Sequence, residues 1–199
     1  MVSAKLICNP TAGRGRAGRL LGNVQAMLHS LGVDNQVALT HRPGEATTLA
    51  AQALDEGYAL VIAMGGDGTL NEVVNGLVQE ADDGKPNGRA GALGVIPVGT
   101  GNDFIKMLGI PQDWRAACNR LATGQARSVD IGRVNGRIFL NNVGIGFDAQ
   151  VGIEAKKIRW LSGQAVYLAA LARNMLLSYR TPEVCVHLDE VKLKQSITL

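Results

Sequence analysis

The sequence predicts an α/β fold, with a parallel sheet covered by helices on both faces and a smaller antiparallel part after it. Strand-like and helical segments alternate from residue 4 to about residue 124. Residues 59–64 are apolar throughout, which is typical of a strand buried on both faces of a parallel sheet. Glycine accounts for 25 of the 199 residues and favours tight strand-to-helix turns.

In this first part, apolar residues at helical period predict a helix that ends before Gly32, and a second helix at 45–56. A third helix follows residue 69, and a fourth occupies 113–123 with Asp113 as its N-cap. Strands are expected at 4–8, 33–40, 59–64 and 92–98.

The pattern changes after residue 124. Two strand-like segments at 127–134 and 137–143 flank Asn135 and Gly136, a pair that strongly indicates a hairpin. A mostly helical segment at 153–179 and a second hairpin from residue 183 follow. We therefore expect an α/β domain at 1–125, and at 126–199 the beginning of an antiparallel domain whose C-terminal part is absent.

The composition is that of a globular protein with a sizeable core, since 46% of the residues are hydrophobic and 19% are charged. A net charge of +3 does not indicate a nucleic-acid partner. The cysteines Cys8, Cys118 and Cys185 lack metal-binding spacing, so we expect them to be reduced and buried in a cytoplasmic protein. No apolar run approaches the roughly 18 residues that span a bilayer.

The most informative segment is a glycine-rich loop between a strand and a helix, formed by Gly65, Gly66, Asp67, Gly68 and Thr69. Glycines let backbone N–H groups approach a polyphosphate, and the helix N-terminus adds positive partial charge. The carboxylate of Asp67 would repel phosphate, so it suits Mg²⁺ or a base near a phosphoryl acceptor. The alternative is a plain turn in which Asp67 caps the helix.

A second loop, PVGTGNDF at 97–104, ends the next strand. Because ligands of open α/β sheets bind outside the carboxyl ends of the strands, we expect both loops to converge on one crevice. The alternative is two independent turns, with Asn102 or Asp103 capping a short helix.

A third candidate follows the first strand, where Asn9 and Gly13 belong to an Asn-Pro-x-x-Gly turn on the same edge. A formal dinucleotide fingerprint begins at Gly13, but the second strand lacks the terminal acid that such a site requires. The turn is also basic, since it carries Arg14, Arg16 and Arg19. These side chains suit contact with phosphate and a solvated basic surface equally well.

Other catalytic classes are not indicated, because neither a Walker A lysine motif nor a nucleophile elbow is present. Asp148 lies in a Gly-Phe-Asp-Ala segment, where it could face a substrate or cap the following helix. The apolar residues at 153–179 favour core packing, with a lipid pocket or a membrane-facing lip as the alternative.

Four motifs in this order resemble the diacylglycerol kinase catalytic family: NPTAG at 9–13, GGDGTLNE at 65–72, GTGND at 99–103 and GFDA at 146–149. The family includes bacterial lipid kinases and the related sphingosine and ceramide kinases. The resemblance covers nearly the whole chain. It implies a nucleotide domain like those of phosphofructokinase and NAD kinase, then a β-sandwich domain, with ATP between the two.

The resemblance also implies roles for single residues. Asp67 matches a proposed general base, Asp148 matches a residue that contacts the lipid headgroup, and Asp103 is expected on the substrate side. The nucleotide and its phosphates would contact Asn9, Gly13, Thr40, Gly65, Gly66, Asp67, Gly68, Thr69, Thr100, Gly101 and Asn102, with Glu72 supporting the glycine-rich loop. The Mg²⁺ ligands of the family lie beyond the end of this sequence.

The expected activity is transfer of phosphate from ATP, with Mg²⁺, to diacylglycerol or a similar lipid at a membrane surface. The protein is expected in the cytoplasm, with peripheral contact to the membrane. No nucleic-acid partner is expected. A homodimer is left open. One alternative is NAD kinase, which shares the GGDGT loop. Another is a nucleotide-binding fragment without catalysis, because the C-terminal part is absent.

Overall fold

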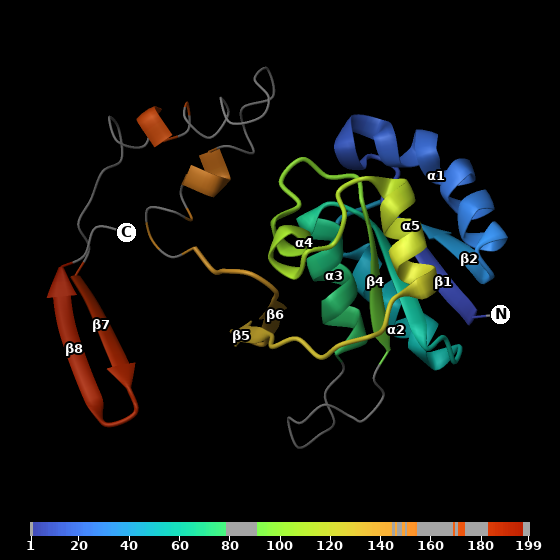
Figure 1. The fold of residues 1–199 in the computed structure, drawn as a ribbon. Coiled ribbons are helices and arrows are strands. Elements are labelled where there is room, and N and C mark those ends of the chain that lie inside the picture. The colour runs from blue at the N-terminus through green and yellow to red at the C-terminus, as the bar shows by residue number, and fades with distance from the viewer. Residues whose placement is uncertain are drawn as a thin grey trace. The chain divides into compact units, whose positions relative to one another are not determined.

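The first part of the chain folds around a four-stranded parallel sheet (Figure 1). A computed structural model describes residues 2–78, 91–144 and 183–196, together with residues 146, 149, 151–154, 169 and 171–173. Contacts divide the chain into two units, Met1–Asn141 and Asn142–Leu199. The strands of the sheet are β1 (Val2–Cys8), β2 (Val33–Leu39), β3 (Leu60–Gly65) and β4 (Ala92–Pro97).

The sheet has the order β2-β1-β3-β4, and every neighbouring pair is parallel. Cys8 at the end of β1 lies opposite Leu39 and Met64, and Gly65 lies opposite Pro97. The carboxyl ends of all four strands are therefore aligned along one edge, as the sequence predicted.

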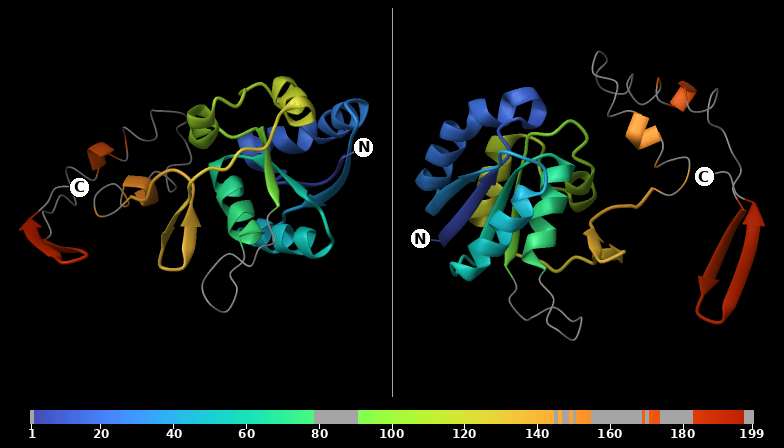
Figure 2. Two further views of the ribbon diagram at one scale, coloured as in Figure 1. Left: turned by 60° about the horizontal axis from the view of Figure 1, so that its bottom comes forward. Right: turned by 180° about the vertical axis from the view of Figure 1, so that it is seen from behind.

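Helices cover both faces of the sheet, and the left view of Figure 2 shows them on either side. Side chains alternate along β1, so Leu6 packs with one core cluster and Ile7 with the other. The first cluster includes residues of α1 (Ala12–Ser30) and α5 (Trp114–Thr123). The second includes residues of α2 (Glu45–Asp55), α3 (Asp67–Leu77) and α4 (Asp103–Leu108).

The two short helices after β4 have well-defined ends. The side chain of Asp113 accepts hydrogen bonds from the backbone N–H groups of Arg115 and Ala116, so the predicted cap of α5 is confirmed. α4 ends at Gly109 in the left-handed conformation, and its last carbonyl, that of Leu108, accepts a bond of 2.8 Å from Arg127.

The antiparallel part begins with β5 (Gly132–Val134) and β6 (Arg137–Phe139), which are shorter than the sequence predicted. The predicted turn at Asn135 and Gly136 is confirmed, with φ of 47° and 76°. In the second unit, β7 (Glu183–Leu188) pairs with β8 (Val191–Ser196). The predicted helical segment 153–179 lies largely outside the described residues. Across the described ranges, no helix combines the length and apolarity needed to cross a membrane.

The first unit extends to Asn141, beyond the boundary that the change of pattern indicates at residue 125. The reason is that β6 packs on α3, although it belongs to a separate two-stranded sheet. The division of the chain into two functional domains at residue 125 stays a prediction.

Thiol labelling tests the core. Cys8 and Cys118 are buried, and burial raises the pKa of both thiols to about 11, whereas Cys185 is exposed and the expectation of a buried thiol is wrong there. At pH 8 a thiol of pKa 11 is only about 0.1% thiolate, so we expect one fast-reacting cysteine in the native protein and three in denaturant. Cys185→Ser should remove the fast reaction. A second fast thiol in the native state would contradict the buried positions.

Candidate functional site

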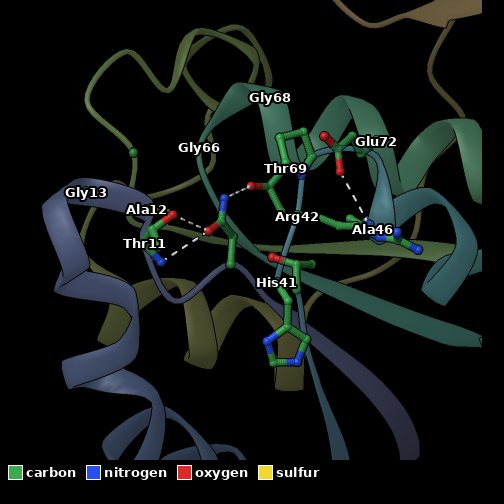
Figure 3. A pocket seen from close by; sticks show the side chains of 14 residues that line it. Thr11, Ala12, Gly13, His41, Arg42, Ala46, Gly66, Gly68, Thr69 and Glu72 are labelled. Carbon is green, nitrogen blue, oxygen red and sulfur yellow. Dashed lines mark hydrogen bonds between the residues drawn. The ribbon is translucent and has the colours of Figure 1, made fainter. Parts of the chain in front are cut away.

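A pocket of about 380 Å³ lies at the carboxyl edge of the sheet (Figure 3). It lies where the chain leaves β1 toward α1 on one face and leaves β3 toward α3 on the other, which is the place where open α/β sheets bind ligands. Loops after all four strands contribute to it, with the lining residues Asn9, Thr11, Ala12, Gly13, Thr40, His41, Arg42, Pro43, Ala46, Gly66, Gly68, Thr69, Glu72 and Gly99.

Asn9 joins the loop after β1 to the start of α3. Its Nδ2 donates to Oγ1 of Thr69 over 3.2 Å, and its Oδ1 accepts from both the N–H and the hydroxyl of Thr11 (Figure 3). Both ends of the amide are therefore engaged, and the side chain is held at the pocket wall.

The turn after Asn9 contains three successive residues in the left-handed region: Gly13 at φ 58°, Arg14 at φ 59° and Gly15 at φ 80°. A side chain at Gly13 would also overlap the carbonyl oxygen of Val98, because the turn lies directly against the end of β4. Gly13 is thus required for its conformation and for a close backbone approach.

The two glycine-rich loops touch each other through their backbones. A Cβ built on Gly99 would lie 2.5 Å from Cα of Gly66. The N–H groups of Val98 and Gly99 both donate to the carbonyl of Gly65, over 2.9 and 3.2 Å. The prediction that these loops converge is therefore confirmed, and the alternative of two independent turns is wrong.

Asp67 connects the first glycine-rich loop to α4. Its Oδ1 accepts a 3.2 Å bond from the backbone N–H of Phe104, in the first turn of α4, whereas α3 itself begins after Gly66 without a side-chain cap. The alternative in which Asp67 caps its own helix is therefore wrong. The half-buried carboxylate lies beside the pocket lining, and its other oxygen, Oδ2, would lie 3.0 Å from a Cβ built on Gly101.

The opposite wall is formed by the turn after β2. The buried Thr40 donates its backbone N–H to the carbonyl of Cys8 over 3.0 Å. Glu72 of α3 accepts a bond from the N–H of Ala46, and its own carbonyl accepts one from the hydroxyl of Thr47. Glu72 thus fixes the start of α2 beside the pocket.

Glu45 sets the pH range in which this turn is held. Its carboxylate accepts bonds from the backbone N–H groups of His41 and Arg42, and these bonds, first that of His41, hold the pKa of Glu45 below its usual value of 4.5. A lowered pKa means that the stabilisation is complete above pH 4.5 and lost as the pH falls through the lowered value. We expect the amide exchange of Arg42, corrected for intrinsic rates, to accelerate below pH 4.5. Glu45→Gln should abolish this transition, and an unchanged transition would contradict the role of Glu45.

The structure brings half of the predicted site residues together in the pocket lining. Those that line the pocket are Asn9, Gly13, Thr40, Gly66, Gly68, Thr69 and Glu72. Gly65 is buried, and Asp67 of the first glycine-rich loop lies outside the lining, as do Thr100, Gly101, Asn102 and Asp103 of the second. Asp103 is exposed and pairs with Lys106 at 2.9 Å. Asp148 lies outside the described residues.

Sequence reasoning did not assign the side of the pocket that His41 and Arg42 form, where Arg42 contributes a positive charge. Their position directly after the second strand was the available signal, because carboxyl ends of parallel strands share one edge. Within the part of the chain that the structure describes, no three His, Cys, Asp or Glu residues gather as a metal site.

The pocket is suited to a phosphorylated ligand. Backbone groups of glycine-rich loops and the N-terminus of the eleven-residue α3 border it, and Arg42 adds a cation. Fold and site together define an open α/β protein with a crevice at its topological switch point, and the lining of that crevice is suited to an anion.

The chain belongs to the diacylglycerol kinase catalytic domain family, whose model matches residues 3–134. It is 40% identical over 192 residues to a diacylglycerol kinase of Bacillus subtilis, covering 95% of this chain and 60% of that protein. It is 39% identical over 165 residues to one of Staphylococcus saprophyticus, covering 82% and 52%. The chain thus spans between about half and three fifths of the length of these relatives.

Solved structures agree with this assignment. A Bacillus anthracis protein provisionally assigned as a diacylglycerol kinase superposes with a TM-score of 0.75 at 29% identity, over 96% of this chain and 61% of that one. A diacylglycerol kinase structure from the same organism gives a TM-score of 0.59 at 31% identity, over 70% and 48%.

Proposed function

We propose that this chain is the nucleotide-binding part of an ATP-dependent lipid kinase, which transfers the γ-phosphoryl group to a hydroxyl of diacylglycerol or a similar neutral lipid. The observation that carries the proposal is the pocket at the N-terminus of α3, where two glycine-rich loops meet. The names of the relatives give the substrate class, since they are diacylglycerol kinases.

The proposed nucleotide site comprises the predicted residues that line the pocket. Amides near Gly66 and Gly68 and the α3 N-terminus would stabilise negative charge on the phosphates, and Arg42 would add to this. Mg²⁺, when bound, would neutralise charge that develops on the transferring group. Mg²⁺ commonly takes one or two protein carboxylates plus phosphate oxygens, and Asp67 fits this pattern as the alternative to its role as a proton acceptor.

The acceptor side is proposed from the family resemblance. Asp67 would accept the hydroxyl proton, Asp148 would contact the lipid headgroup, and Asp103 would lie on the substrate side, beside the loop that carries Thr100, Gly101 and Asn102. A lipid acceptor requires at least transient contact with a membrane surface from the cytoplasm.

The test is a phosphate-transfer assay with γ-labelled ATP, Mg²⁺ and a lipid extract in mixed micelles. It uses the protein extended to the stop codon of its gene. A labelled lipid is the expected product, and its identity names the acceptor. Labelling of NAD with inert lipids would replace this function by NAD kinase. Nucleotide binding without any transfer would leave a non-catalytic binding module.

A further inference from the structure

The turn after β2, residues 40–44, forms one wall of the pocket and depends on its two ends for its position. At its first end the buried Thr40 is bonded to the end of β1, whereas residues 41–44 are exposed. At its other end the turn continues directly into α2, whose first turn contributes Ala46 to the pocket lining. The place of α2 on its neighbour α3 therefore determines where this wall lies, and Arg42 with it.

Two bonds attach the first turn of α2 to α3, and both end on Glu72. The hydroxyl of Thr47 donates to the carbonyl oxygen of Glu72 over 2.9 Å. The backbone N–H of Ala46 donates to Oε2 of Glu72 over 3.3 Å (Figure 3). The bond from Thr47 is the shorter one, and its acceptor belongs to the backbone of α3. It therefore fixes α2 against the helix itself rather than against a side chain that can change its rotamer.

The backbones of the two helices approach each other closely at the same place. A Cβ built on Gly76 would overlap the carbonyl oxygen of Thr47 and would lie 2.7 Å from Cβ of Ala50. Only a glycine leaves room for this approach. Thr47 thus contacts α3 twice, through its hydroxyl at Glu72 and through its carbonyl at Gly76, one turn further along the helix.

The bond from Thr47 depends on its hydroxyl. A threonine hydroxyl donates one bond, whereas the side chain of valine has a similar shape and donates none. The carbonyl of Glu72 lies within α3 and accepts a backbone bond there, so loss of the hydroxyl leaves this carbonyl with a partner. Neither Thr47 nor Gly76 lines the pocket. An effect of these two positions on a bound ligand must therefore pass through the position of α2.

We propose, on the basis of the nucleotide-binding function above, that Thr47 is a positioning residue of the pocket. Together with Gly76 it fixes the wall that carries Arg42 at one distance from α3. A wall that is held in place before binding spares the ligand the cost of ordering it. The net contribution of one hydrogen bond is modest, so we expect Thr47→Val to weaken ATP binding about 3- to 10-fold.

The experiment compares Thr47→Val with Thr47→Ser and with Thr123→Val in the full-length protein. Thr123 of α5 makes the same kind of bond, from its hydroxyl to the carbonyl of Asn119 over 2.9 Å, and it is exposed outside the pocket. Titration calorimetry measures the Kd for ATP, and hydrogen exchange is followed at the amides of Ala46 and Thr40. Thr47→Val should weaken ATP binding and accelerate exchange at Ala46. Exchange at Thr40, which is bonded to β1, should stay unchanged, and Thr123→Val should alter neither quantity.

Thr47→Ser separates positioning from general stability. The variant keeps the hydroxyl but loses a methyl group, so its thermal stability should fall while its affinity for ATP stays within about twofold of the wild type. A merely structural role would give affinities that follow the thermal stability of the variants. Gly76→Ala tests the same contact from α3. Its added Cβ would push α2 away from α3, so we expect faster exchange at Ala46 and about tenfold weaker ATP binding in the folded protein.

The outcomes separate this role from the proposed function. Unchanged ATP affinity in a folded Thr47→Val protein, or a loss that Thr47→Ser shares, would overturn the positioning role and leave nucleotide binding intact. Equal acceleration of exchange at Ala46 and Thr40 would overturn it too, because it would indicate a general loss of stability. A wild-type protein that does not bind ATP would overturn the proposed function, and the role of Thr47 in nucleotide binding with it.

Discussion

Replacing Gly13 by alanine is expected to weaken nucleotide binding by more than tenfold. The backbone at Gly13 has a φ of 58°, and a side chain there would overlap the carbonyl oxygen of Val98. The left-handed conformation alone costs a residue with a Cβ about 1–2 kcal/mol. In addition, the turn between β1 and α1 must move away from the end of β4 to relieve the overlap. Titration calorimetry with ATP measures the loss of affinity.

Gly22→Ala is the matched control, because Gly22 lies in the same helix and a Cβ there meets nothing within 4 Å. It should bind nucleotide like the wild type and gain roughly 0.5–1 kcal/mol in unfolding free energy. Wild-type affinity in a folded Gly13→Ala protein would show that the pocket does not bind the nucleotide.

The second large effect is expected at Asp67. Asp67→Asn keeps an oxygen that can accept the Phe104 N–H, so the loop and α4 should stay in place. The charge and the proton-accepting group are lost, and we expect phosphoryl transfer by the full-length protein to fall about 10²- to 10⁴-fold. Steady-state kinetics and thermal unfolding measure the two consequences separately.

Asp67→Ala should lose the same activity and, in addition, the cap of α4, which is worth about 0.5–2 kcal/mol. Asp113→Ala is the control, because it removes the cap of α5 outside the site. It should lower the stability of the protein and leave its activity unchanged. Full activity in Asp67→Asn would leave capping of α4 as the sole role of this carboxylate.

The features that the sequence predicted correctly include a helix cap and a hairpin turn, which depend on residues close together in the chain. The cap at Asp113 bonds to residues two and three positions away, and the turn at Asn135 and Gly136 depends on its own two residues. The convergence of the glycine-rich loops was predictable because parallel strands align their carboxyl ends. Their positions along the chain were sufficient for that inference.

The sequence did not predict contacts that the tertiary fold creates. The bond from Phe104 to Asp67 joins residues 37 positions apart, and a local pattern offers Asp67 only its own helix. The left-handed conformation of Arg14 could not be predicted from the sequence either, because a residue with a Cβ adopts it only where the surrounding structure compensates its cost. The bond of Glu72 to the N–H of Ala46, 26 positions away at the start of α2, was not predicted either, and its support of the glycine-rich loop stays a prediction.

The position of β1 in the centre of the sheet has a consequence for biosynthesis. β1 leaves the ribosome before its partners β2 and β3, and β3 is complete only at Gly65. Until then β1 presents unpaired backbone groups beside apolar side chains, a state prone to aggregation. The turn at Gly13 also awaits Val98, against which it packs. A nascent chain that ends before Val98 therefore carries the turn at Gly13 without the backbone against which it packs.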